Sequence, residues 1–161
     1  MIVYLVRHAI AEERGAAWPD DRERPLTPKG VTRFRNIAER LATGGVRVGA
    51  IFSSPCIRAR QTAELLVPAW AQVPIQHVEE LAPAHTPASL AKVLADRAAQ
   101  KAVALVGPEP DLGILAAWMI GAKSPLPFKK GGVARIDCGD TIKGGDGTLV
   151  WMVTPKVVLG A

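Results

Sequence analysis

The pattern of apolar and polar positions along the chain predicts short buried strands that alternate with amphipathic helices. Residues 2–6 form a continuous apolar run that is rich in β-branched side chains. Shorter runs of the same kind cover residues 48–53 and 102–106, with a weaker one at 75–78. An uninterrupted apolar run of this length, rich in β-branched residues, predicts a strand covered by protein on both faces.

Helix starts recur between these runs. Thr27 followed by Pro28 predicts a capped helix with proline at its first position, and apolar residues at helical spacing continue it to Gly44. Ser54 and Pro55 repeat the same start after the second strand. Further helices are predicted from Pro87 to about Ala98, and over residues 111–120.

The last third of the chain predicts a hairpin. Strands are expected at residues 133–137 and 148–153, joined by a glycine-rich turn at 143–147, and we expect them to add antiparallel edge strands. Strands that alternate with helices elsewhere predict a mostly parallel sheet. The predicted fold class is therefore α/β, with three layers, a mostly parallel central sheet flanked by helices, and one domain over residues 1–161.

Composition narrows the class of protein. The chain has 161 residues, of which 48% are hydrophobic and 22% charged, as expected for a folded domain. Its longest apolar run, residues 112–122, is shorter than the roughly 18 residues of a membrane span, and residues 1–8 lack the pattern of a signal peptide. Cys56 and Cys138 lie far apart without metal-ligand spacing. We therefore expect a cytoplasmic protein with no metal and no organic cofactor.

The charge argues weakly for a polyanion partner. The formal net charge is +5, but the basic residues are spread over both halves of the chain and aromatic residues make up only 5%. Without a long basic run or a stacking platform, we expect no nucleic-acid partner. A group of arginines around one small anion accounts for the same charge, and we expect Lys129 and Lys130 to form a solvated turn.

Candidate chemistry follows the predicted strands. Arg7 and His8 come directly after the first strand, and Arg58 comes shortly after the second. The carboxyl ends of parallel strands lie at one edge of a sheet, so these side chains should meet there. Guanidinium groups bind phosphate through paired hydrogen bonds, and a histidine among them is kept neutral and nucleophilic. The pattern predicts covalent phosphoryl transfer through His8.

Four ordered segments extend this pattern over most of the chain. Together they resemble the histidine phosphatase superfamily, also called the phosphoglycerate mutase-like superfamily, and within it the short SixA-type phosphohistidine phosphatases. The likeness runs from residue 1 to about residue 155. The segments are residues 5–9 (LVRHA), 24–30 (RPLTPKG), 53–63 (SSPCIRARQTA) and 105–112 (LVGPEPDL).

The resemblance implies a role for each matching residue. His8 would attack the phosphoryl group and become phosphorylated, while Arg7 and Arg58 would hold its oxygens. Arg24 would lie near the mouth of the pocket, although an arginine that faces solvent or pairs with a carboxylate fits equally well. Ser54 is a candidate substrate-binding residue, but capping a helix is the role we favour for it.

The chain departs from the family pattern at one position. Where the family has Gly-His-Glu-Pro, this chain has Gly107, Pro108, Glu109 and Pro110. The family histidine donates to phosphoryl oxygens, and proline has no side-chain donor and no backbone N–H. Losing one such donor costs about a hundred- to a thousandfold in rate. His85 is a candidate replacement, although an exposed loop histidine is the simpler interpretation.

The resemblance implies a phosphohistidine phosphatase that acts on another protein, such as a phosphotransfer domain. A phosphoramidate bond to imidazole needs little protonation to break, so a general acid is not required, and Glu109 is expected to shape a turn before a helix. Two alternatives remain. One is a phosphate- or phosphohistidine-binding module with impaired turnover, which Pro108 favours. The other is a small-molecule phosphomonoesterase, which a carboxylate in the pocket would favour.

Overall fold

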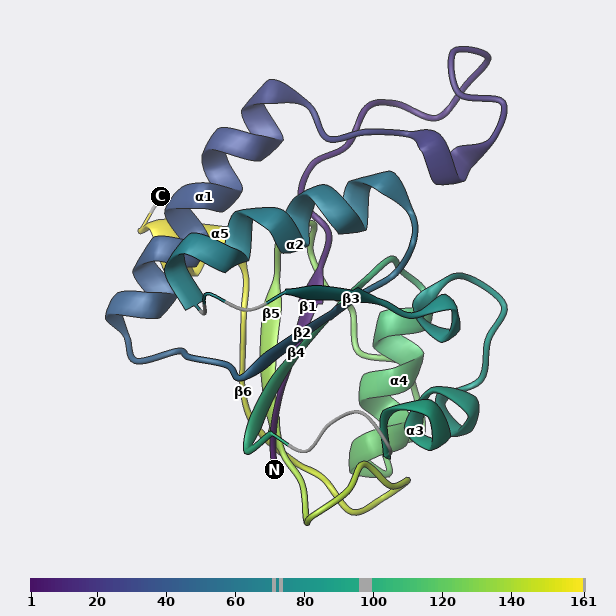
Figure 1. Ribbon diagram of the computed structural model, residues 1–161, viewed down its shortest axis with the longest axis vertical. Coiled ribbons are helices and arrows are strands. Elements are labelled where there is room, and N and C mark those ends of the chain that lie inside the picture. The colour runs from purple at the N-terminus through teal and green to yellow at the C-terminus, as the bar shows by residue number, and fades with distance from the viewer. Residues whose placement is uncertain (71, 73, 96–99, 161) are drawn as a thin grey trace.

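A six-stranded sheet forms the centre of the protein, as seen in the computed structural model, which describes residues 1–70, 72, 74–95 and 100–160 (Figure 1). The strand order is β3-β2-β4-β1-β5-β6. β1 to β4 are mutually parallel, and β5 pairs antiparallel with both of its neighbours. The predicted α/β class with a mostly parallel sheet and a hairpin at one edge is confirmed. The strands are β1 (Ile2–Arg7), β2 (Ala50–Ser53), β3 (Ile75–His77), β4 (Ala102–Gly107), β5 (Val133–Asp137) and β6 (Thr148–Val153).

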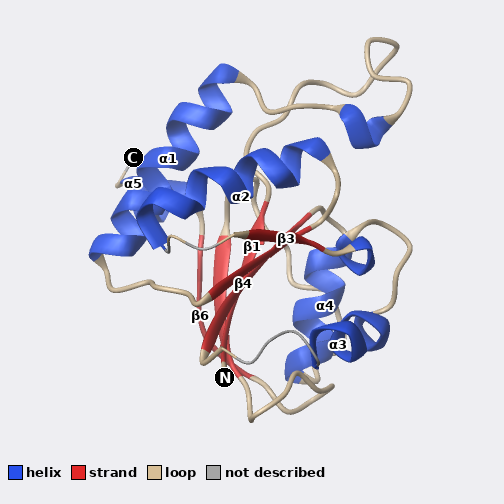
Figure 2. Cartoon of the chain, in the orientation of Figure 1, coloured by secondary structure: helices blue, strands red, loops and turns tan. Residues whose placement is uncertain are grey.

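Helices cover both faces of this sheet (Figure 2). One face carries α1 (Pro28–Thr43), α2 (Ile57–Trp70) and α5 (Pro155–Leu159), and the other carries α3 (Pro87–Ala95) and α4 (Asp111–Ile120). Short 3₁₀ turns, η1 (Asp21–Glu23) and η2 (Glu79–Leu81), lie in the loops.

The pleat of β1 supplies a core to each face. Val3 and Leu5 pack in the cluster that includes α3 and α4, whereas Tyr4 and Val6 pack in the cluster that includes α1 and α2. All four are at most 5% exposed, which explains why this strand has no polar position before Arg7. Successive side chains of a strand point to opposite faces, so a strand buried on both faces must be apolar throughout.

The predicted elements agree with the structure except at some boundaries. The α1 cap is as expected, since Thr27 Oγ1 accepts from the Gly30 N–H at 2.9 Å. Helix α2 begins at Ile57, two residues later than the Ser54-Pro55 start predicted. The second strand begins at Ala50 instead of residue 48, and the third ends at His77. Ala98, which was expected to continue α3, lies outside the described residues.

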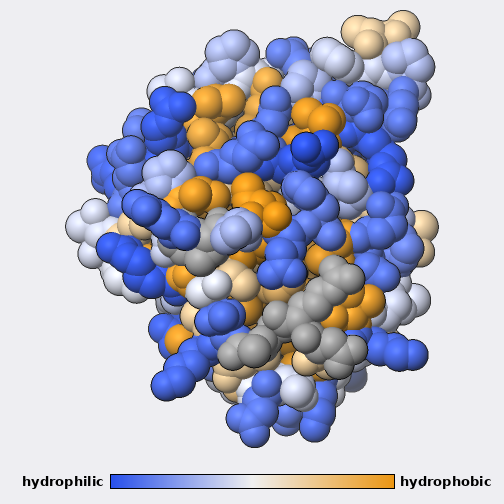
Figure 3. Space-filling model, in the orientation of Figure 1, coloured by the Kyte–Doolittle hydropathy of each residue, from blue (hydrophilic) through white to orange (hydrophobic). Residues whose placement is uncertain are grey.

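The face of the protein seen in Figure 3 is mostly hydrophilic. Figure 3 shows apolar residues exposed in separate patches between hydrophilic ones on the face in view. Within the described ranges, no helix combines the length and apolar character needed to cross a membrane.

Candidate active site

The ends of β1 and β4 lie side by side at one edge of the sheet. Arg7 pairs with Gly107 in register, and the His8 N–H donates to the Gly107 carbonyl at 3.2 Å. Arg58 reaches the same edge from the first turn of α2. The side chains open into one cavity of about 240 Å³. Its lining residues are Arg7, His8, Glu12, Glu13, Arg14, Arg24, Arg58, Glu109 and Lys130.

The His8 ring has a defined orientation and protonation state. It lies 2.7 Å from the Ala9 carbonyl through Nδ1, which must therefore carry the proton and donate. Nε2 is left with its lone pair and accepts from Arg58 Nε at 3.3 Å. Because the side chain is buried, its pKa falls from 6.5 to about 3, although the Ala9 bond opposes this shift and nearby guanidiniums add to it. His8 is neutral at physiological pH, as expected, but burial contributes more than like charge.

Thr62 links the segment that follows β1 to the helix that carries Arg58. Its Oγ1 accepts from the Ala9 N–H at 3.0 Å and donates to the Arg58 carbonyl at 2.7 Å. Thr62 is completely buried. Sequence reasoning missed this residue, and the only signal for it was its place one helical turn after Arg58, on the same face of α2.

Asp21 binds the Nη atoms of Arg58, whereas His8 accepts from its Nε. Arg58 is 2% exposed; its Nη1 donates to the Asp21 carbonyl at 2.6 Å, and its Nη2 lies 3.0 Å from Asp21 Oδ2. The same carboxylate receives Arg24 Nε at 2.8 Å and lies 3.4 Å from Arg14 Nε. Its hydrogen bond from Arg24 is the main reason that the pKa of Asp21 is lowered. Sequence reasoning did not single out Asp21, because nothing local shows that this loop folds back over α2.

Arg7 is held by the segment before β5. Its Nη1 donates to the Phe128 carbonyl at 2.6 Å, whereas Nε is buried without a hydrogen-bond partner in the described part of the chain. Burial lowers the pKa of Arg7, against the attraction of Glu109. Arg7 lines the cavity, and its positive charge favours an anion there.

Glu109 has the structural role expected of it. Its carboxylate accepts from the Gly113 N–H at 3.0 Å, in the first turn of α4, and from the Phe128 N–H at 2.9 Å. These bonds fix the segment that supplies the Phe128 carbonyl to Arg7. Glu109 therefore stabilises the position of Arg7 as well as the start of α4.

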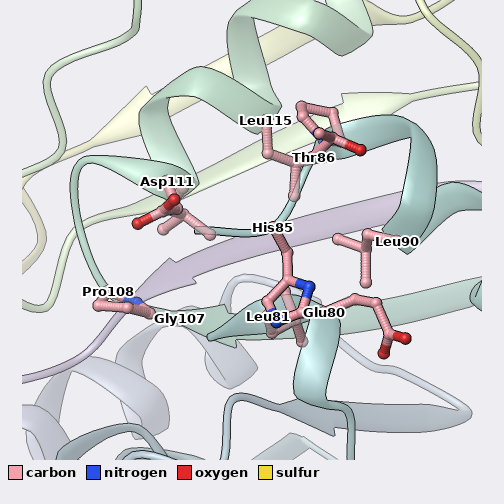
Figure 4. Close-up of a pocket in the computed structure, with 11 residues that line it drawn as sticks. Glu80, Leu81, His85, Thr86, Leu90, Gly107, Pro108, Asp111 and Leu115 are labelled. Atoms are coloured by element: carbon pink, nitrogen blue, oxygen red, sulfur yellow. The ribbon is translucent and has the colours of Figure 1, made fainter. Parts of the chain in front are cut away.

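Pro108 and His85 lie together, but in a separate, smaller pocket. Both border it with Gly107 and Glu80, as Figure 4 shows. His85 is exposed on the loop before α3 and does not line the cavity that contains His8. The structure brings His85 to the proline that replaces the family histidine, yet leaves it outside the group of arginines.

Of the two remaining predicted residues, Arg24 lines the cavity and Ser54 does not. Arg24 lines the cavity and is also paired with a carboxylate, so both interpretations of it hold in part. Ser54 is fully buried and absent from the cavity lining; its Oγ accepts from the Cys56 N–H at 3.3 Å. That bond occupies the Ser54 hydroxyl in the turn before α2, away from the cavity.

Sequence comparison identifies the family of this chain. The model of the histidine phosphatase superfamily, branch 1, matches residues 3–86, which include Arg7, His8 and Arg58. This chain belongs to that superfamily. A related chain of Picosynechococcus sp., an uncharacterised protein, is 38% identical over 146 residues and covers 86% of each chain.

Solved structures of the superfamily show the same architecture. The protein histidine phosphatase SixA complexed with tungstate superposes with a TM-score of 0.85 at 25% identity, over 98% of this chain and 99% of that one. A phosphohistidine phosphatase SixA described as putative, from Agrobacterium tumefaciens, gives 0.79 at 26% identity, over 96% and 97% of the chains. This histidine phosphatase is thus SixA-like over nearly its whole length.

Proposed function

We propose that this histidine phosphatase removes the phosphoryl group from phosphohistidine on another protein. The observation that carries the proposal is the state of His8: neutral, protonated on Nδ1, and facing a guanidinium with Nε2. A fixed neutral imidazole among cationic donors suits attack on phosphorus. The likeness to SixA supports the phosphohistidine substrate, and the tungstate in that structure is an oxyanion of the same shape as phosphate.

The reaction proceeds in two displacements. His8 Nε2 attacks phosphorus, the nitrogen–phosphorus bond of the substrate breaks, and the displaced imidazole takes a proton from solvent. Water then attacks the phosphorylated His8 and releases inorganic phosphate. Arg58 Nε must leave His8 Nε2 before the first step, and it can then donate to a phosphoryl oxygen in the cavity that Arg7 also lines.

Pro108 limits this chemistry without touching the nucleophile. It follows Gly107, whose carbonyl accepts from the His8 N–H, so position 108 is next to the reacting centre in the backbone. A proline there offers no donor to the phosphoryl oxygens. We therefore propose an active but slow phosphatase, with a phosphohistidine-binding module of negligible turnover as the second candidate.

Trapping phosphate on the protein separates these functions. The protein is incubated with a phosphohistidine peptide labelled in its phosphoryl group, and the label is located by mass spectrometry under alkaline conditions. We expect label on His8, release of phosphate, and loss of both in His8→Ala. The matched control is His77→Ala, which removes an exposed histidine of β3 and should change nothing.

Other outcomes identify the alternatives. Tight binding of the peptide without release of phosphate selects the binding module. Glu12 and Glu13 line the cavity, so a phosphomonoester such as phosphoserine is assayed in parallel. Faster hydrolysis of that ester than of phosphohistidine would replace our proposal with a phosphomonoesterase. Release that persists in His8→Ala would exclude the covalent mechanism.

A further inference from the structure

An open groove adjoins the cavity on the side of Arg7. Besides Arg7, four basic side chains border it, and we call it the basic groove: Arg33, Lys129, Lys130 and Lys156. Arg7 and Lys130 line both the groove and the cavity, so the two adjoin. With a volume of about 510 Å³ the groove is larger than the cavity, and it extends beyond the reach of one phosphoryl group.

Three separate elements build the basic groove. Arg33 lies on α1, Lys156 lies on α5, and the two lysines lie in the segment before β5. This segment is bound to the backbone of the site. The Gly131 N–H donates to the His8 carbonyl at 2.9 Å, and the Arg7 N–H donates to the Gly132 carbonyl at 3.0 Å. Lys129 and Lys130 are exposed in a turn, as expected, and the two glycines that follow them hold this turn next to His8.

The charges of the basic groove are uncompensated. No Asp or Glu of the described chain lines it, and none of its four basic residues forms an ion pair there. Other arginines near the site are neutralised, such as Arg22 by Glu79 and Arg24 by Asp21. Four cations without an ion-pair partner in the described part of the chain, on one open surface, create a positive potential that attracts an anionic partner.

We propose that the basic groove docks an acidic surface of the phosphoprotein substrate and so selects which phosphohistidine enters the cavity. This inference rests on the proposed function. Ile10, which is partly exposed, also lines the groove, which suits a protein face with acidic and apolar side chains. No aromatic residue of the described chain lines the groove to stack bases, so a protein fits it better than a single-stranded nucleic acid.

The test uses two peptides that differ only in charge. Each carries one phosphohistidine, flanked by Asp and Glu in the acidic peptide and by Ser and Gln in the neutral one. The groove variant R33Q/K129Q/K156Q removes three charges and leaves Lys130 in place, because that residue also lines the cavity. The matched control K92Q/K123Q/K143Q removes three charges from exposed lysines elsewhere.

We expect the wild type to hydrolyse the acidic peptide with a kcat/KM about tenfold above that of the neutral peptide at low salt. The preference should fall towards one in the groove variant and at high salt, and remain in the control variant. Hydrolysis of free phosphohistidine, which is too small to reach the groove, should be equal in all three proteins. Equal rates on both peptides in the wild type, or a preference that survives in the groove variant, would overturn the proposal.

Binding of the unphosphorylated peptides distinguishes failure of docking from failure of catalysis. Fluorescence anisotropy measures their affinities without any turnover. If no peptide is hydrolysed but the groove variant alone loses the preference for acidic peptide, docking stands and the proposed function fails. A DNA duplex or phosphatidylserine vesicle that binds more tightly than the acidic peptide, through the same three residues, would assign the groove to that ligand and overturn our inference.

Discussion

The segments that follow β1 and β4 meet at the site, but they differ in the polar groups that they contribute. After β1, His8 is fixed by Ala9, Thr62 and Arg58, and three guanidiniums surround it. After β4, the equivalent position is Pro108, which offers no donor and borders a separate pocket. The His8 side, which we propose supplies the nucleophile, is fixed by several hydrogen bonds, whereas Pro108 supplies no donor on the other side. A site of this kind should still bind and transfer a phosphoryl group, but with less stabilisation of the transition state.

The largest expected effect comes from breaking the nucleophile side. Arg58→Ala removes a donor to the phosphoryl group and the partner of His8 Nε2. We expect kcat on a phosphohistidine peptide to fall by about a hundred- to a thousandfold. The rate of phosphate release from the peptide measures this effect, with Arg60→Ala as the control on the same helix. Activity within a few-fold of the wild type would show that Arg58 does not hold the transferred group.

The burial of His8 predicts a pH dependence of stability. Its pKa is about 3 in the folded protein and near 6.5 when unfolded, so the unfolded state binds the proton more readily. The free energy of unfolding should therefore fall as the pH drops below about 6.5, and the His8 contribution reaches about 2 kcal/mol at pH 5. Urea unfolding at pH 7 and pH 5 measures it.

The same experiment on His8→Gln isolates this contribution, because carboxylates such as Asp21 also lose stabilising interactions in acid. The variant should lose about 2 kcal/mol less than the wild type between the two pH values. An identical loss in both proteins would mean that His8 is accessible to protons in the folded state.

Restoring a hydrogen-bond donor at position 108 should raise the phosphatase activity. Pro108→His returns a donor next to Gly107, whose carbonyl already contacts the His8 backbone. We expect kcat on the phosphohistidine peptide to rise at least about tenfold. Pro108→Ala is the control, since it removes the proline without adding a donor. An unchanged rate in Pro108→His would indicate that another group already fills the role, and His85→Ala then tests the histidine that borders the same pocket as Pro108.

The smallest effect is expected from Asp21→Asn. The amide keeps the size of the side chain but removes the charge that pairs with Arg58 and Arg24. We expect about a tenfold rise in KM for the peptide with a smaller change in kcat, since the arginines lose their common anchor. Asp20→Asn changes the exposed neighbour and should be silent. A loss confined to kcat would point instead to a role of Asp21 in the chemical step.

The sequence predicted the architecture because its signals are local. The uninterrupted apolar run of β1 and the Thr27-Pro28 start of α1 each depend on a few adjacent residues, and both agree with the structure. The proximity of Arg7, His8 and Arg58 could be predicted because the carboxyl ends of parallel strands lie at one edge of the sheet. The start of α2 was misplaced, since the Ser54 hydroxyl bonds to the Cys56 N–H in a turn before the helix.

The contacts that fix the site depend on tertiary packing and left little sequence signal. Asp21 meets Arg58 across 37 positions of the chain, and Thr62 meets Ala9 across 53. No periodicity or motif spacing encodes such pairs. For the same reason the desolvation of His8 was underestimated, because burial of a residue that follows a strand is set by the loops that cover it.

A crystal structure with vanadate would test the central claim most directly. Vanadate adopts the five-coordinate geometry of phosphoryl transfer when a nucleophile bonds to it. We predict vanadium bonded to His8 Nε2, with its oxygens accepting from the Arg7 guanidinium and from an Arg58 that has released the imidazole. An anion held only by Lys129 and Lys130, with Nε2 still bound to Arg58, would contradict the assignment of His8 as the nucleophile.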